Sequence, residues 1–419
     1  MIVNVLIFLA GLLVYAGYGL PGLGYLAAAV LISYGAGLLT RRFRWVMWIS
    51  VGLNAVMLTL LKLQSVTGMS LLAPLGVSYF TLQLISYNVD VFKGKYEPER
   101  NLFRFALFVT YLPHLFIGPI ERYDAMKPAL AQRKITWDGI FSGAARALWG
   151  LFKKLVIASR AGVIIGAISG DTESYQGAFA LAAVLLYSVQ LYADFSGGMD
   201  MVLGLSQMLG IRLSENFDAP YFSQSFQEFW RRWHITLGSW LREYVYIPLG
   251  GNRKGKLRKV LNLIVTFLVS GLWHGVQYLL WGLFNGIFVA FGSKLKTKWK
   301  LLNQVGTFLL VSLLWCFFVW PDMWTALQMV FSVFATFNYG AFFAEIGTMG
   351  LTLGDWIVFA AALVLLWGYD LRRSRLHSWF ENRCPAAKTA VLCLLGLTVL
   401  VFGMYGMGFV AEDFIYSRF

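Results

Sequence analysis

Charged side chains are scarce in this sequence of 419 residues. Asp, Glu, Lys and Arg make up only 13% of it, about half of what a soluble globular domain carries. Because a surface in contact with water needs more polar cover than this, the composition excludes an ordinary soluble protein. Cysteine is scarce too: the chain has Cys316, Cys384 and Cys393, and no two have Cys-x-x-Cys spacing. This argues against a disulfide framework and a zinc site, and we predict no metal.

Long apolar runs take the place of charge, and hydrophobic residues reach 58%. A bilayer core about 30 Å thick is crossed by about 20 helical residues. Most of the charge-free stretches are long enough to cross it: residues 1–40, 63–89, 174–193, 260–293, 301–321, 323–344 and 389–411. We therefore predict an all-α, polytopic integral membrane protein, with residues 1–419 forming a single membrane domain of about 10–12 membrane helices.

The basic excess follows from this placement. Lys and Arg number 35 against 21 Asp and Glu, for a formal net charge of +14. Cytoplasmic loops of membrane proteins are rich in Lys and Arg, so residues 41–44 and 372–375 are predicted cytoplasmic, and nucleic-acid binding is not implied. Residues 322–355 lack both residue types and are predicted outside, but the pattern does not give their exact path or that of residues 105–170.

Residues 212–259 differ from the segments around them. They hold nine basic and four acidic residues, several Trp residues, and turn signals at Pro220, Pro248 and Gly250-Gly251. With no charge-free run of 20 residues, this stretch is not a simple spanning helix. We predict an interfacial or re-entrant segment on the cytoplasmic side, because irregular backbone at membrane depth needs shielding by protein or a cavity.

Histidine is the residue type that stands out among the polar groups, and the chain has four. His274 lies inside the apolar run 260–293, about 21 Å along a helix that enters near residue 260. An imidazole there either makes a structural hydrogen bond or carries out proton chemistry. Gly271 and Gly275 permit the close approach of a backbone or a substrate, which favours a site. His377 follows a basic cluster and is predicted to be a solvated loop residue.

The other two histidines each allow a structural reading. His234 follows Trp230, Arg231, Arg232 and Trp233. It belongs either to an aromatic and basic belt at the membrane interface or to the lining of a cavity open to the cytoplasm. His114 lies between Pro113 and a Gly118-Pro119 break, where we expect it to satisfy backbone groups at a kinked helix.

Two carboxylates interrupt the next apolar stretch. Asp194 and Asp200 lie six residues apart around Gly197-Gly198, and six residues turn a helix by about 600°. The two share no face unless the helix bends at the glycines. Because buried charges are expensive in a membrane, we predict that each pairs with an Arg or Lys from residues 146–160.

One further segment superficially looks like a phosphate-binding loop. It runs from Gly250 to Lys256 and contains Arg253 and Lys254, but it lacks the G-x-x-x-x-G-K-[ST] spacing and follows no strand. Its basic side chains can still meet an anionic cytosolic molecule.

At these residues the sequence resembles the membrane-bound O-acyltransferase (MBOAT) superfamily, and within it the branch of the alginate O-acetyltransferase membrane subunit. The similarity is carried by residues 76–83, 87–94, 113–122, 190–201, 215–221, 229–237, 242–253 and 271–275. The chain is somewhat short for that branch. Internal repeats of the transporter type are not visible.

The resemblance implies a ring of helices around a central funnel, in which the superfamily histidine corresponds to His274 and a second functional histidine to His234. It implies a cytosolic acetyl-CoA donor, with no bound cofactor. It further implies an exported polysaccharide acceptor, reached directly or through an extracytoplasmic relay protein with a serine nucleophile, in the lipid of a bacterial cytoplasmic membrane. We assign donor binding to basic residues and structural or tunnel-lining roles to four others. The donor-binding residues are Arg231, Arg232, Arg253, Lys254 and Lys256, and the four others are Asp194, Ser196, Trp273 and His114.

The chemistry of acyl transfer needs a base beside a thioester and a hydroxyl. A neutral imidazole can remove the hydroxyl proton and return one to the leaving thiolate, and we assign this role to His274. His234 orients the thioester, shares the proton or stabilises the oxyanion.

Two alternatives stay open from the sequence. One is a D-alanyl transfer protein of teichoic acid modification, which takes its acyl group from a carrier protein; its motif is expected to lack Arg231-Arg232 and the run 247–253. The other is a non-catalytic transporter of polysaccharide or lipid, supported by the polytopic pattern and the buried charges.

Overall fold

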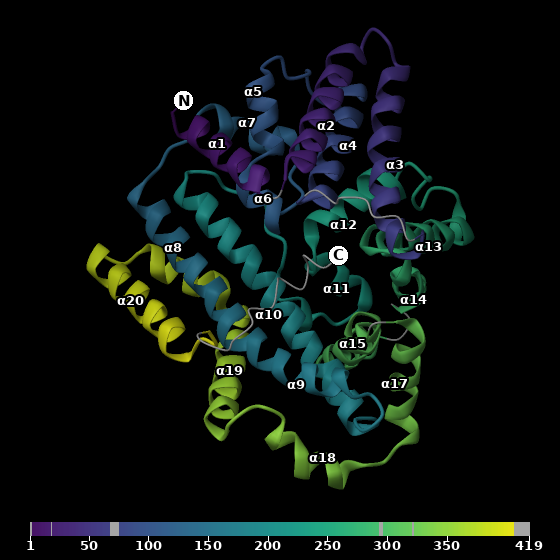
Figure 1. Cartoon of the computed structure of the whole chain (residues 1–419), viewed down its shortest axis with the longest axis vertical. Coiled ribbons are helices and arrows are strands. Elements are labelled where there is room, and N and C mark those ends of the chain that lie inside the picture. Colours follow the sequence, from purple (N-terminus) through teal and green to yellow (C-terminus); the bar gives the residue numbers. More distant parts are fainter. Residues whose placement is uncertain (1, 18, 68–74, 293–295, 321, 406–419) are drawn as a thin grey trace.

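The fold is helical throughout the part of the chain that the computed structural model describes, residues 2–17, 19–67, 75–292, 296–320 and 322–405 (Figure 1). No strand occurs in these ranges, and the one β-type contact is an isolated antiparallel bridge between Phe217 and Trp233. The α-helices of the first half are α1 (Ile2–Gly17), α2 (Leu20–Leu39), α3 (Trp45–Thr67), α4 (Val77–Phe92), α5 (Leu102–Val109), α6 (Leu112–Phe116), α7 (Tyr123–Ala131), α8 (Trp137–Phe152), α9 (Ser159–Gly170) and α10 (Ala178–Met208).

The second half consists mostly of shorter helices, and its longest helices are α13, α19 and α20. The α-helices are α11 (Phe226–Arg232), α12 (Ile235–Leu241), α13 (Gly255–His274), α14 (Leu279–Phe291), α15 (Lys300–Leu314), α16 (Cys316–Val319), α17 (Met323–Ala335), α18 (Tyr339–Glu345), α19 (Leu353–Glu381) and α20 (Pro385–Phe402). Two π-helical turns, η1 (Lys153–Ala158) and η3 (Arg242–Tyr246), and three 3₁₀ turns, η2 (Pro220–Phe222), η4 (Val276–Tyr278) and η6 (Ile346–Thr348), join them.

Six helices among the described residues are long and apolar enough to cross a membrane: Leu20–Leu39, Trp45–Gln64, Ala178–Met208, Lys300–Val319, Leu353–Glu381 and Pro385–Phe402. A seventh span results if α17 and the α18–η6 segment, bent by 111°, count as one. The all-α, multi-pass prediction is confirmed. The number is below the predicted 10–12 because several apolar stretches fold as shorter helices, such as the 16-residue α1 and α4, or begin with charges, as α13 does.

Helix α10 is the central spine, and the pair α8–α9 packs along it with the π-turn η1 between them (Figure 1). Glycines set this close approach. A Cβ atom on Gly150 would lie 2.4 Å from the carbonyl oxygen of Gly197, and one on Gly143 would lie 2.5 Å from that of Gly204. Gly197 is therefore a packing residue, and α10 runs through it without a break. The bend considered at Gly197-Gly198 does not occur.

Ion pairs across the same interface confirm the prediction that the two aspartates pair with residues 146–160. Lys154 Nζ lies 2.6 Å from Asp194 Oδ1, and Lys153 Nζ lies 2.6 Å from Asp200 Oδ2. Arg146 Nε donates to Asp200 at 2.9 Å. The two carboxylates have different partners, as expected for positions that do not share a helix face.

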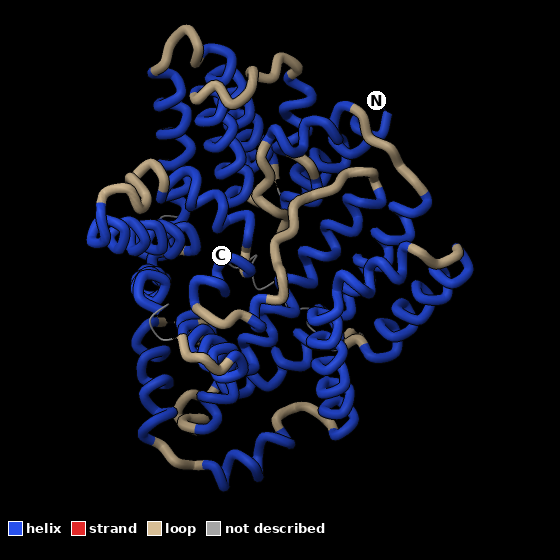
Figure 2. The backbone as a smooth tube through the Cα atoms, turned by 180° about the vertical axis from the view of Figure 1, so that it is seen from behind, coloured by secondary structure: helices blue, strands red, loops and turns tan. Residues whose placement is uncertain are grey.

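The apolar run 260–293 is two segments, as its length requires. α13 ends at His274, Gly275 has φ 151°, and α14 returns antiparallel to α13 after the turn η4. Residues 212–259 form α11, α12, η3 and loops, and no candidate membrane span lies within them. Loops also cross the middle of the face seen from behind in Figure 2. The assignment of 212–259 to the cytoplasmic interface stays a prediction.

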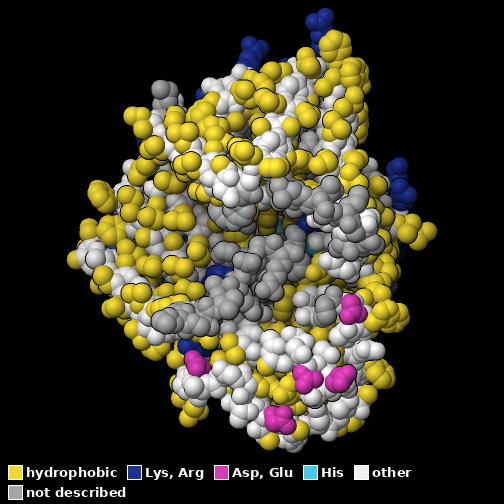
Figure 3. All heavy atoms as spheres, in the orientation of Figure 1, with side chains coloured by type: hydrophobic (Ala, Val, Ile, Leu, Met, Phe, Trp, Pro, Cys, Tyr) yellow, Lys and Arg dark blue, Asp and Glu magenta, His cyan; other side chains and the backbone are white. Residues whose placement is uncertain are grey.

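Two large groups of buried side chains form the interior. One lies among α1–α7 and is rich in aromatic rings, while the larger one surrounds α10 and continues through α11–α19. Figure 3 shows hydrophobic side chains spread over much of the face seen in Figure 1, with Asp and Glu on its lower part. This acidic end contains residues 322–355, whose outside location stays a prediction.

Candidate active site around two histidines

His274 is the last residue of α13, and aromatic rings surround it. Its ring centroid lies 4.7 Å from that of Trp273, 5.4 Å from that of Trp281 and 5.8 Å from that of Phe318, all nearly edge to face. The side chain is 6% exposed. The helix must end here because Gly275 adopts a positive φ. His274 is thus held at a helix end within a dry aromatic wall.

His234 lies in a sharp turn between α11 and α12. It has φ 46° and ψ 52°, and only one other non-glycine residue in the described ranges has a positive φ. The bridge between Trp233 and Phe217 precedes the turn, and the N–H of Ile235 donates to the carbonyl oxygen of Asn216 at 3.0 Å after it. Non-glycine residues seldom adopt this conformation unless their surroundings enforce it. The crossing segment around Asn216 supplies that constraint.

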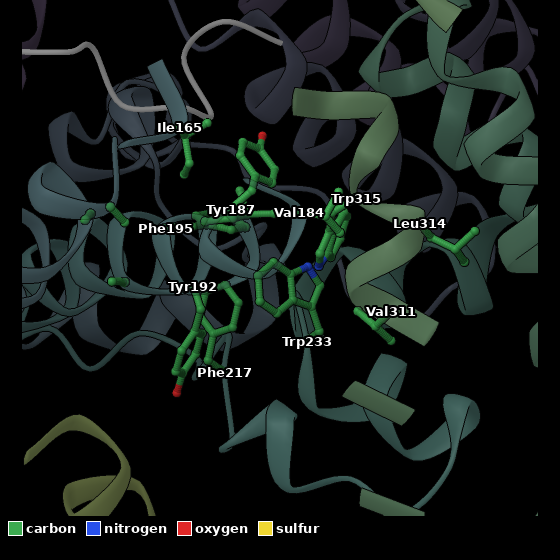
Figure 4. Close-up of a cluster of buried hydrophobic side chains, with 14 of the residues drawn as sticks. Ile165, Val184, Tyr187, Tyr192, Phe195, Phe217, Trp233, Val311, Leu314 and Trp315 are labelled. Atoms are coloured by element: carbon green, nitrogen blue, oxygen red, sulfur yellow. The ribbon is translucent and has the colours of Figure 1, made fainter. Parts of the chain in front are cut away.

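The two histidines line one small cavity of about 10 Å³. The wall is aromatic and aliphatic apart from the histidines and one serine: Leu191, Trp230, Trp233, His234, Leu237, Ser270, His274, Trp281, Trp315 and Phe318. Figure 4 shows Trp233 facing Trp315, with Tyr192, Phe195 and Phe217 on the other side; the two indole centroids are 5.3 Å apart. Two ionisable side chains, 40 residues apart in sequence, therefore meet in a small buried cavity.

This arrangement is compatible with proton transfer in acyl chemistry, and the comparison with known proteins shows which family the chain belongs to. Residues 98–336, more than half of the chain, match the sequence profile of the membrane-bound O-acyltransferase family. The chain belongs to the MBOAT family. The matched region contains both histidines, so this MBOAT enzyme has its two-histidine cavity within the part that defines the family.

Similar proteins of known name are bacterial. The MBOAT chain is 36% identical over 402 residues to the probable alginate O-acetylase AlgI of Pseudomonas fluorescens, covering 92% of this chain and 79% of that protein. It is 35% identical over 297 residues to the peptidoglycan O-acetyltransferase of Helicobacter pylori, covering 62% and 56%. It is 28% identical over 279 residues to the teichoic acid D-alanyltransferase of Streptococcus thermophilus, covering 62% and 67%. The prediction of an acyltransferase of the MBOAT, O-acetyltransferase type is confirmed.

Glycines beside His274 in the MBOAT site serve packing. A Cβ atom on Gly271 would lie 2.6 Å from the carbonyl oxygen of Tyr278, and one on Gly282 would lie 2.4 Å from that of Phe267. The small residues thus let α13 and α14 touch along their backbones. The sequence allowed either a backbone or a substrate to approach Gly271 closely, and in the structure the backbone of Tyr278 does so.

His114 lies apart from the two-histidine cavity. It is buried in α6, with its Nδ1 3.2 Å from the side-chain amide nitrogen of Gln83. A Cβ on Gly118 would lie 2.5 Å from the Cα of His114, so this glycine permits the chain to fold back at the Pro113 to Pro119 break. The sequence predicted that His114 satisfies backbone groups at the kink. In the structure its ring is instead bonded to the Gln83 side chain of α4.

The other predicted tunnel residues anchor helices around the cavity. Ser196 accepts a hydrogen bond from Lys153 Nζ at 2.8 Å, and Asp194 pairs with Lys154, so both join α10 to η1. Trp273 donates from Nε1 to the carbonyl oxygen of Ser78 at 3.1 Å, which joins α13 to α4. Phe195 lies between the two α10 residues in sequence, and its ring centroid is 5.0 Å from that of His234.

The basic residues predicted to bind the donor lie at the surface. Arg231, Arg253, Lys254 and Lys256 are exposed, and Arg232 is paired with Glu228 at 2.7 Å. The two-histidine cavity is lined by none of them. Their role in binding a donor stays a prediction.

His377 corrects one expectation from the sequence. It was expected in a solvated loop, but α19 continues through it to Glu381, and the two side chains lie 3.1 Å apart. The helix extends here because the Arg-rich cluster before His377 contains no helix breaker. His377 remains about half exposed, so its predicted contact with solvent holds.

Sequence reasoning did not single out a charged link between two helices and the loop that follows α10. Arg146 donates to both carboxylate oxygens of Glu215, at 2.7 and 2.6 Å, and Arg373 of α19 bonds the same carboxylate at 2.6 Å. Burial raises the pKa of Glu215, but the two guanidiniums outweigh it and hold that pKa below its ordinary value. These residues border a groove of about 740 Å³ between α8, α10, α19 and α20. No local motif marks this set, because its members are far apart in sequence.

Lys62 is a second residue that the sequence reasoning passed over. It lies within the candidate span Trp45–Gln64 of α3, and α3 packs against α13 and η4 next to His274. Its charge is close enough to act on His274. A lone lysine in an apolar span was the available signal, since such residues tend to be functional.

Proposed function

We propose that this MBOAT enzyme transfers an acetyl group from cytosolic acetyl-CoA to hydroxyl groups of an exported polysaccharide. Transfer goes directly to the glycan or through an extracytoplasmic partner protein whose serine relays the acetyl group. The observation that carries the proposal is the pair of buried histidines on one dry cavity, in a chain similar to O-acetylases of alginate and peptidoglycan. The bacterial relatives support a place in a bacterial cytoplasmic membrane.

The chemical step needs one base and one proton donor. His274 removes the proton from the acceptor hydroxyl while the hydroxyl oxygen attacks the thioester carbonyl. The tetrahedral oxyanion then collapses, the C–S bond breaks, and the thiolate of CoA takes up a proton from the imidazolium. His234, on the same cavity, shares this proton or stabilises the oxyanion. The dry aromatic wall strengthens these interactions and keeps water from hydrolysing the thioester.

The exposed basic side chains within residues 212–259 support a donor that carries phosphates. Arg231, Arg253, Lys254 and Lys256 are exposed cations in one continuous stretch of the chain before His274. Guanidinium and ammonium groups bind phosphate as forks and as point charges, respectively. We infer that this stretch attracts the donor, while the histidines act on its thioester.

A second candidate is D-alanyl transfer from a carrier protein. The teichoic acid D-alanyltransferases of Streptococcus thermophilus and Bacillus subtilis are 28% and 27% identical to the chain, against 35–36% for the O-acetylating relatives described above. The higher identity favours acetyl transfer. Membership of an enzyme family gives no support to the transporter alternative.

Purified protein in proteoliposomes with labelled acetyl-CoA and a soluble glycan acceptor tests the proposal. Wild type should label the acceptor, and His274→Ala should abolish labelling at normal membrane expression. His377→Ala is the matched control, because it removes an exposed histidine of α19 and should leave turnover unchanged. Full turnover by His274→Ala refutes its role as the base. Labelling that requires a D-alanyl carrier protein, and not acetyl-CoA, decides for the second candidate.

A further inference from the structure

Asn216 is the residue on which the His234 turn rests. It is fully buried in the segment between α10 and η2. Its side-chain oxygen Oδ1 accepts hydrogen bonds from the backbone N–H and the hydroxyl of Thr236, both at 2.9 Å. The same oxygen lies 3.3 Å from Nδ1 of His234. One carbonyl oxygen thus serves the turn and the imidazole together.

The hydrogen bonds from Thr236 determine which side-chain atom of Asn216 is the amide oxygen and which is the amide nitrogen. A backbone N–H is only a donor, so the atom that faces it must be the amide oxygen and not the NH₂ group. Nδ1 of His234 therefore faces an acceptor and carries the proton. In a neutral imidazole the lone pair is then on Nε2, which is the nitrogen that can take up a proton.

We propose that Asn216 is a positioning residue for acyl transfer, which holds His234 in the tautomer with the proton on Nδ1 and the lone pair on Nε2. This inference rests on the proposed function, because it assigns His234 a part in moving the proton between hydroxyl and thiolate. The opposite tautomer would present an N–H at Nε2, and such a group cannot accept a proton. Phe195 and Trp273, at 5.0 and 6.1 Å between ring centroids, hold the ring plane.

Residues on both sides of Asn216 are fixed to other helices. Glu215 is bound by Arg146 of α8 and Arg373 of α19, and the same Arg373 donates to the carbonyl oxygen of Phe217 at 3.0 Å. Arg146 and Arg373 thus fix the residues on either side of Asn216, while the side chain of Asn216 contacts His234. Hydrogen-bond partners of this kind orient metal-binding histidines in other enzymes, where their loss typically costs about 10- to 100-fold in metal affinity or activity.

The charged and titratable groups around His234 bear on any pH test. His274 of α13 shares its cavity, and the Glu215, Arg146 and Arg373 cluster lies behind Asn216. On α10, Asp194 precedes Phe195 in sequence and is paired with Lys154. An additional carboxylate at position 216 would be nearer to the imidazole than any of these, and it would stabilise the imidazolium.

The test compares Asn216→Ala and Asn216→Asp with wild type for acetyl transfer from acetyl-CoA in proteoliposomes across pH. The alanine variant lacks the acceptor, so turnover should fall about 100-fold while the KM for acetyl-CoA changes little. The aspartate variant keeps an acceptor for Nδ1–H, so it should retain most turnover. Its added negative charge should move the acid limb of the pH–rate profile to higher pH. Asn54→Ala, which removes a buried asparagine of α3 bonded to Ser33 and Ser50, is the matched control.

Each outcome decides the inference. Turnover of Asn216→Ala equal to that of wild type overturns it, and so do equal losses in both variants without a shift of the acid limb. If the alanine variant fails to fold, the aspartate variant decides alone: retained turnover with a shifted acid limb supports the inference, and lost turnover or an unmoved limb overturns it. Absence of acetyl transfer by wild type, both with and without the extracytoplasmic partner protein, overturns the proposed function instead. The same variants are then compared for D-alanyl transfer from the carrier protein, where the same pattern is expected.

Discussion

Substitution of Gly271 by alanine is a sharp test of how the helix pair α13–α14 positions His274. The added Cβ would lie 2.6 Å from the carbonyl oxygen of Tyr278 and 3.4 Å from the Cα of Gly282. A carbon and an oxygen in contact need about 3.4 Å, so the two backbones must separate by roughly 0.8 Å. His274 lies three residues further along, about 4.5 Å along the helix axis, and must move with the displaced turn.

The magnitudes follow from this displacement. Overpacking of this kind typically costs about 1–3 kcal/mol, and the contact here is with backbone, which cannot rotate away. A misplacement of about 1 Å at a catalytic group can cost about 100-fold in rate. We therefore expect Gly271→Ala to lower the melting temperature measurably and to reduce acetyl transfer per folded molecule about 100-fold.

The assay pairs thermal unfolding of the detergent-purified protein with labelled acetyl transfer in proteoliposomes. Gly306→Ala is the control, because a Cβ at that position of α15 would meet nothing within 4 Å. Both variants replace a helical glycine by a better helix former, so only the contact with Tyr278 distinguishes them. If Gly271→Ala keeps the melting temperature and turnover of Gly306→Ala, the argument that this backbone contact positions His274 is refuted.

Two further predictions concern the charged groups of the fold. Lys153→Met leaves Asp200 without one of its two cationic partners and should destabilise the protein by about 3–5 kcal/mol. The double variant Lys153→Met, Asp200→Asn should recover much of that loss. Equal melting temperatures for the single and the double variant would contradict this. Because the pKa of Glu215 is lower in the folded state, its stabilising effect is present above its unfolded pKa of about 4.3 and is lost as the pH falls through the lowered folded value. Glu215→Gln should remove this part of the acid sensitivity, which melting curves between pH 7 and pH 3 would show as a shallower fall than in wild type.

Much of the architecture could be predicted because the membrane restricts what a chain can do. Charge-free runs had to become helices, and buried charges had to find partners. Asp194 and Asp200 accordingly pair with Lys154 and Lys153. The same reasoning singled out His274 and His234, since ionisable groups near membrane depth are rare unless they serve a function.

The number of spans could not be predicted, because length and composition do not show where a helix breaks. Gly275 ends α13 through a positive φ, while Gly197-Gly198 leaves α10 intact. In sequence both are glycines in apolar surroundings. The difference arises from the partner: Gly197 meets the backbone of α8, whereas the chain at Gly275 turns back to form α14.

The support of the site was also beyond sequence reasoning. Asn216 belongs to a segment that matched the family pattern, but a single buried asparagine has no periodicity and no spacing that points to His234, 18 residues later. Arg146, Glu215 and Arg373 come from three distant parts of the chain. Their convergence depends on tertiary packing, which no local pattern describes.

The size of the two-histidine cavity has a consequence for how reactants reach it. A single water molecule needs at least about 10–15 Å³ of such space, and the cavity offers about 10 Å³ behind a wall of tryptophans. A thioester and a hydroxyl group need far more room than one water molecule. In the proposed reaction the side chains around the histidines must therefore move apart before both reactants can enter.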